Sequence, residues 1–88
     1  MADFLTQAQA ALAAADPAKR ATLLESKTPG GRGTCKGAVV LRHIPDNPHH
    51  PFVTHWRNDD LGGFHKGSYF DSLPEAVANF KTRAAQGR

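Results

Sequence analysis

Apolar residues recur near the start of the chain at the spacing of a helix. The positions Phe4, Ala8, Ala11, Leu12 and Ala15 fall at i, i+4, i+7, i+8 and i+11, which places them on one helical face. Asp3 is a suitable N-cap, because its side chain can accept a hydrogen bond from the first turn. The pattern predicts a helix that packs through a narrow, alanine-rich face.

A second helix is predicted over residues 17–26. It would follow Asp16-Pro17, since Asp is a good N-cap and Pro suits the first helical position. Residues 1–26 are therefore predicted as a helical N-terminal segment, either a hairpin or one kinked helix. A DNA-reading helix-turn-helix is the alternative, but only Lys19 and Arg20 stand near the start of the second helix.

Residues 27–37, KTPGGRGTCKG, are predicted as a flexible loop, because glycine and proline interrupt regular structure. The spacing fits neither the phosphate-binding P-loop nor the dinucleotide-binding glycine motif. A loop that touches anions through Arg32 and Lys36 is the alternative interpretation.

Three strands follow, over residues 37–44, 52–57 and 64–70, rich in β-branched and aromatic side chains. The turn between the last two, NDDLGG, contains residues that tolerate left-handed conformations. Gly67 is a candidate bulge. Short connections make neighbouring strands antiparallel, so residues 38–70 are predicted to form a three-stranded β-meander.

A C-terminal helix is predicted over residues 72–86. Ser72 and Glu75 have the spacing of a capping box, in which each side chain bonds the backbone of the other residue. An apolar stripe follows at helical spacing: Leu73, Ala76, Val77, Phe80 and Ala84. The fold class is therefore α+β, a single domain with the order α-α-β-β-β-α.

Strand side chains alternate between the two faces of a sheet, which sorts the residues of the meander. One face is predicted to be buried under the C-terminal helix: Val39, Leu41, Phe52, Trp56 and Phe70. The other, outer face would carry Arg42, His55, Arg57, His65 and Tyr69, with Val40 and Val53 among them. Alternatively, the N-terminal helices cover this face and its polar groups are only solvated at the rim.

The formal net charge of the 88 residues is +3, which favours anionic partners. The single cysteine, Cys35, allows no intramolecular disulfide and fits a reducing compartment, so a cytoplasmic protein is expected. No apolar run approaches the ~18 residues that a membrane span requires, so we expect no membrane partner.

Residues 42–57, RHIPDNPHHPFVTHWR, contain four of the five histidines. Their spacing matches no standard zinc site, so neither a metal nor another cofactor is expected. Nothing orients Cys35 against a histidine as a nucleophile and base, and Asp59-Asp60 occupy a turn. We therefore expect a protein that is not an enzyme. The loop itself is stiffened by prolines and could contact a partner through Asn47, His49 and His50.

The segment YFDSLPEAVANF, after three strands, resembles the arm-type DNA-binding domains of phage and transposon integrases over residues 37–86. In that family the sheet enters the major groove and the helix backs it. By position, the resemblance implies DNA contacts from Arg42, His55, Arg57, His65 and Lys66. The helix-first order is also similar to double-stranded RNA-binding domains, but Leu73-Pro74-Glu75 stand where that family has lysines. The segment THWRNDDLGGFHKGSYF is similar to short uncharacterised proteins of bacterial mobile elements.

We therefore expect a small accessory protein that binds nucleic acid, DNA rather than RNA, through the outer face and its loops. The candidate residues are Arg42, His55, Arg57, His65, Lys66, Tyr69, Arg32 and Lys36. One alternative is a protein-interaction module of a phage or mobile element, such as an anti-CRISPR-like inhibitor of a host defence complex. Another is a small structural domain.

Overall fold

The computed structural model describes residues 3–28 and 35–87. Two helices and four strands follow one another along the chain: α1 (Phe4–Ala14), β1 (Ala21–Thr28), β2 (Gly37–His43), β3 (Phe52–Asn58), β4 (Phe64–Phe70) and α2 (Leu73–Gln86). The strands form one antiparallel sheet in the order β1-β2-β3-β4. The α+β class is thus confirmed.

The predicted second helix is wrong, and the sheet has four strands instead of three. After α1 the chain makes a single turn, in which the backbone carbonyl and side chain of Asp16 accept from the amides of Lys19 and Ala18. Residues 21–28 then pair with β2. Long-range pairing overrides local helix propensity here. A bulge between Thr22 and Leu24 interrupts the strict alternation by which a strand is recognised.

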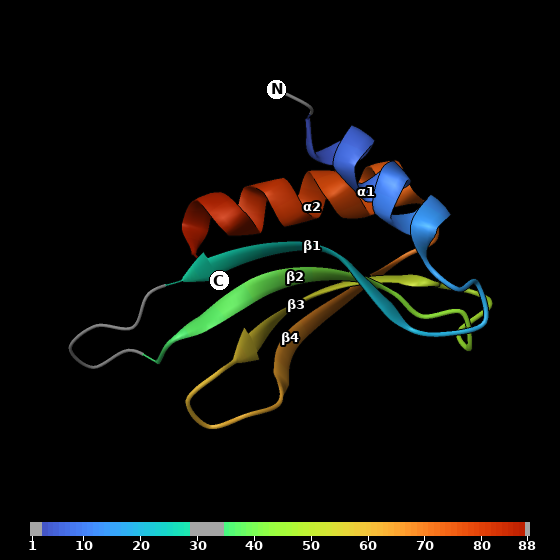
Figure 1. Ribbon diagram of the computed structural model, residues 1–88. Helices are drawn as coiled ribbons and strands as arrows, with labels where there is room; N and C mark the ends of the chain where they lie inside the picture. The colour runs from blue at the N-terminus through green and yellow to red at the C-terminus, as the bar shows by residue number, and fades with distance from the viewer. Residues whose placement is uncertain (1–2, 29–34, 88) are drawn as a thin grey trace.

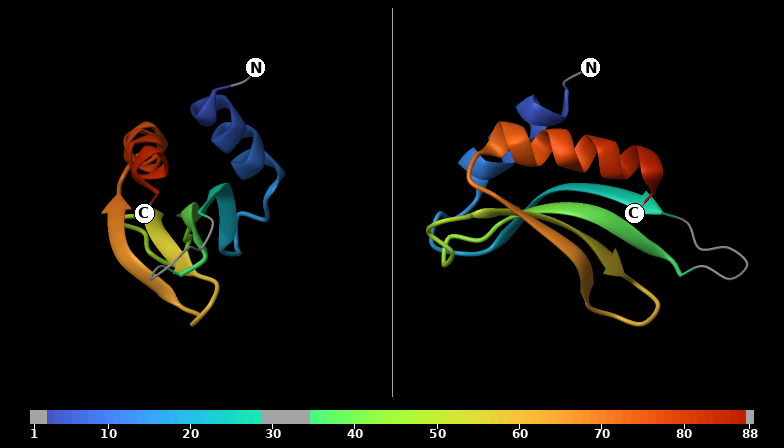
Figure 2. Two further views of the ribbon diagram at one scale, coloured as in Figure 1. Left: turned by 90° about the vertical axis from the view of Figure 1, so that its left-hand side faces the viewer. Right: turned by 180° about the vertical axis from the view of Figure 1, so that it is seen from behind.

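Both helices lie on the same side of the sheet (Figures 1 and 2). Helix α2 runs across β2, β3 and β4, while α1 packs on β1 and against α2. The core lies between the layers, where Phe4 meets the buried Phe80 edge to face with ring centroids 5.3 Å apart. The alternative in which the N-terminal helices cover the outer face is therefore wrong. We call the uncovered side of the sheet the open face.

The ends of the helices follow the predictions in part. Asp3 accepts a hydrogen bond from the amide of Thr6 and caps α1, and α2 ends at Gly87 in the left-handed conformation. Ser72 is the N-cap residue of α2, but its side chain makes no cap hydrogen bond, so that half of the predicted capping box is absent. Pro74 in the first turn removes one of the amides that would otherwise need a partner.

The tight turn between β3 and β4 forms as predicted. The side chain of the buried Asn58 accepts hydrogen bonds from the amides of Asp60 and Leu61. Gly62 and Gly63 both have φ near +85°, a region that favours glycine. The predicted loop at 27–37 lies mostly outside the described residues, and its last residue, Gly37, begins β2.

Candidate nucleic-acid interface

The open face can be read from the strand register, because residues directly opposite each other in an antiparallel sheet share a face. Three rows of partners cross the sheet from β1 towards β4. Row by row, they are Lys27, Ala38, Arg57 and Phe64; Glu25, Val40 and His55; and Thr22, Arg42, Val53 and Tyr69. The predicted faces of β2 and β3 are therefore confirmed.

The side chains of Val40, Val53 and His55 on the open face are buried from solvent although no helix covers them. Val40 and Val53 are 1% and 0% exposed, and His55 is 7% exposed. The ring of Phe64 stacks on His55 with centroids 4.3 Å apart. Burial, with help from the charges of Arg42 and Arg83, lowers the pKa of His55 from 6.5 to about 4. His55 is therefore a neutral, buried ring and supplies no charge to a partner at neutral pH.

The two arginines predicted for this face differ in their surroundings. Arg57 donates to Glu25 over 3.0 Å and to Asp59 over 2.6 Å, and these carboxylates raise its pKa above its ordinary value. The guanidinium of Arg42 instead lies 4.7 Å from the centre of the Phe64 ring. In the described part of the chain, no carboxylate pairs with Arg42. Arg42 is thus the better donor for an anionic ligand.

Three further side chains complete the exposed layer of the open face. Tyr69 and Phe64 are 55% and 47% exposed, and Lys27 is exposed on β1. Lys27 and Phe64 were not among the candidate residues. Lys27 was missed because its segment was read as a loop after a helix. Phe64 was missed because a bulge reverses the alternation within β4.

That bulge also corrects the placement of His65. The register between β3 and β4 shifts between Thr54 and Trp56, so that His65 is opposite Trp56 on the helix side of the sheet. The predicted position of His65 on the open face is therefore wrong. The irregular residue is Lys66, with φ of +58°, next to the predicted bulge residue Gly67.

The remaining candidates lie at the two ends of the sheet. The amide of Lys36 donates to Asp60, and its carbonyl accepts from Asp59, which places Lys36 beside the β3–β4 turn. Arg32 lies outside the described residues. At the other end, Asn47 accepts from the amide of His50, whose side chain pairs with Asp71. His49 is exposed in the same loop.

In the described ranges, no group of three or more His, Cys, Asp or Glu side chains could hold a metal ion. No helix in the same residues is long and apolar enough to cross a membrane. Comparisons with protein-family models, curated proteins and solved structures find no match to this chain.

Proposed function

We propose that this chain is a small non-enzymatic accessory protein that binds single-stranded nucleic acid on the open face. The observation that carries the proposal is the exposed ring of Tyr69 in one row with Arg42 on a sheet face that neither helix covers. An aromatic ring on a sheet is a stacking platform for any base, and nearby cations hold the phosphates.

The charges on the open face set the strength of the expected interaction. Within the described residues, Lys27 and Arg42 are cations of the open face that form no ion pair, whereas Arg57 pairs with Glu25 and Asp59. Two phosphate contacts to a single strand give a slope of log K against log salt of about −1.4. Binding should therefore be modest, with a dissociation constant of about 10⁻⁴ to 10⁻⁶ M at physiological salt.

Fluorescence anisotropy with labelled oligonucleotides tests the proposal. The wild-type chain should bind single-stranded DNA or RNA at low salt, and duplex DNA more weakly, because paired bases cannot stack on Tyr69. Tyr69→Ala should weaken binding by about 1–3 kcal/mol, the range found when a stacking aromatic ring is removed. Absence of binding to every oligonucleotide at low salt would remove the proposal.

A matched pair of charge-reversal variants distinguishes binding at the open face from non-specific electrostatic attraction. Arg42→Glu reverses a charge on the open face, and Lys81→Glu makes the same change in net charge on an exposed position of α2. Arg42→Glu should abolish measurable binding, while Lys81→Glu should cost less than about threefold, since distant charges are screened. Equal losses in the two variants would show that the open face is not the site.

A second candidate function is docking to a partner protein, as expected for a module of a phage or mobile element. It is favoured by Leu61, which is 82% exposed at the tip of the β3–β4 turn beside the acidic residues Asp59 and Asp60. Leu61→Ser would leave oligonucleotide binding unchanged if nucleic acid is the partner. Pull-down of a specific protein that is lost in Leu61→Ser would favour the second function instead.

A further inference from the structure

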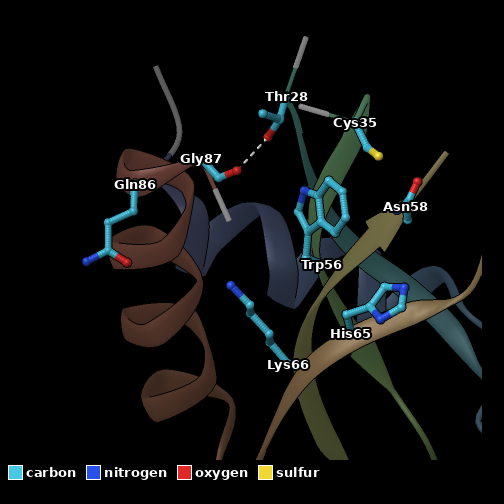
Figure 3. A pocket seen from close by; sticks show the side chains of 8 residues that line it. All are labelled: Thr28, Cys35, Trp56, Asn58, His65, Lys66, Gln86 and Gly87. Atoms are coloured by element: carbon cyan, nitrogen blue, oxygen red, sulfur yellow. Dashed lines mark hydrogen bonds between the residues drawn. The ribbon is translucent and has the colours of Figure 1, made fainter. Parts of the chain in front are cut away.

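A cavity of about 600 Å³ lies on the helix side of the sheet, at the end where α2 finishes. Figure 3 shows it between the last turn of α2 and the ends of β1, β3 and β4. Its volume falls within the ~300–1,000 Å³ typical of small-molecule sites. The described residues that line it are Thr28 of β1, Trp56 and Asn58 of β3, His65 and Lys66 of β4, Gln86 and Gly87 at the end of α2, and Cys35 just before β2.

The β4 bulge determines which side chains reach this cavity. Without the register shift, His65 would point to the open face; with it, His65 is opposite Trp56. Lys66 occupies the left-handed region with φ of +58°, where a lysine is strained by about 1 kcal/mol or more relative to glycine. Bulges commonly re-aim a side chain next to a functional site.

A buried arginine holds the bulge in place. Arg83 of α2 is 8% exposed and donates to the carbonyl of Lys66 over 2.7 Å and to that of Thr54 over 3.0 Å. These bonds join α2 to β3 and β4 at the register shift. The strained position of Lys66 is thus supported by a charged group that is expensive to bury.

Trp56 supplies a fixed flat wall. A Cβ atom added at Gly37 would lie 2.4 Å from the Trp56 ring, so the indole packs directly on the Gly37 backbone. The rings of Trp56 and His65 have centroids 6.2 Å apart and are inclined by 42°. In Figure 3 the ammonium end of Lys66 points into the space between Trp56 and α2.

The charge among the described lining residues is positive. None of the eight described residues that line the cavity is acidic, and Lys66 contributes a cation. The carbonyl of Gly87, at the end of α2, accepts a hydrogen bond from the hydroxyl of Thr28 over 3.0 Å. That bond occupies a helix-end carbonyl that would otherwise attract cations.

We propose that this cavity is a binding site for a small, flat conjugated molecule that carries an anionic group. The ring would pack on Trp56 and His65, and the anion would pair with Lys66. This inference is independent of nucleic-acid binding, because the cavity and the open face lie on opposite sides of the sheet.

The single tryptophan makes the site observable, because its indole N–H gives one side-chain signal in a ¹⁵N-correlated NMR spectrum. We would titrate 2-naphthoate, its neutral analogue 2-naphthamide, its saturated analogue decahydro-2-naphthoate, and adenosine monophosphate. The indole signal should shift with 2-naphthoate or adenosine monophosphate. Affinity for each of the other two analogues should be at least tenfold weaker.

Lys66→Gly is the decisive variant, because glycine accepts φ of +58° without strain and the fold is retained. It should lose at least tenfold in affinity for the anionic ring while its melting temperature stays equal or rises. Lys81→Gln, on the exposed side of α2, and Arg42→Glu, on the open face, should leave that affinity unchanged. The proposal is overturned if no probe shifts the indole signal, if naphthamide binds as well as naphthoate, or if Lys66→Gly binds normally.

Discussion

The helix side of the sheet and the open face both contain valines that solvent does not reach, but different groups exclude the water. Val39 lies in the core cluster under α1 and α2. Val40 and Val53 are equally buried on the face without helices, beside Arg42, Tyr69 and the Phe64–His55 stack. The side chains that bury the valines of the open face are therefore the same ones that would meet nucleic acid, whereas Val39 is buried by apolar residues of the core cluster.

The largest effect expected from this comparison is the loss of a core ring. Phe80→Ala removes a side chain with no exposed surface and its contact with Phe4, and should lower the free energy of unfolding by about 3–5 kcal/mol. Tyr69→Ala, on the open face, should cost less than about 1 kcal/mol, since the ring is more than half exposed. Urea unfolding of the two variants measures the contrast; similar costs would contradict it.

Arg83→Met is expected to have the next largest effect. The variant keeps an apolar stem but leaves the carbonyls of Thr54 and Lys66 without this donor, at a cost of about 3 kcal/mol. Amide hydrogen exchange should rise first around Lys66 and Gly67, because the bulge loses its support. Unchanged exchange in β4 would show that the bulge does not depend on Arg83.

A smaller, pH-dependent effect distinguishes the base of the open face. Because the pKa of His55 is lowered in the folded state, the unfolded chain binds a proton at this residue at a higher pH than the folded chain does. The free energy of unfolding should therefore fall as the pH drops from about 6.5 towards about 4. Phe64→Ala removes the ring that covers His55 and should raise this pKa towards 6.5. NMR titration of the His55 ring measures the shift, and a pKa that stays near 4 would contradict the role of Phe64.

The sequence predicted the elements whose local signals are strong. Helix α2, strands β2 and β3 and the β3–β4 turn all form, and the faces of β2 and β3 were assigned correctly. Helix α2 has one apolar stripe that is buried in the core. The two strands are rich in β-branched and aromatic residues, and the turn contains Asn, Asp and Gly, so the local pattern identifies each of these elements.

The errors fall at the two bulges. In β1 the bulge allows the adjacent residues Leu23 and Leu24 both to be buried. In the sequence, two adjacent apolar residues fit a helical face as well as they fit a bulged strand. In β4 the bulge moves His65 to the helix side and Phe64 to the open face. The partner that supports it, Arg83, is 17 residues from Lys66 in the chain. Such contacts depend on the packed fold and leave no local signal.

We propose that nucleic acid binds the open face and not the helix side. The most direct test is a ¹⁵N-correlated NMR titration of the intact chain with oligothymidylate at low salt. We expect the amide signals of Lys27, Arg42 and Tyr69 to shift together and those of α2 around Lys81 to stay in place. Shifts confined to α1 or α2, or no shifts at any concentration, would contradict it.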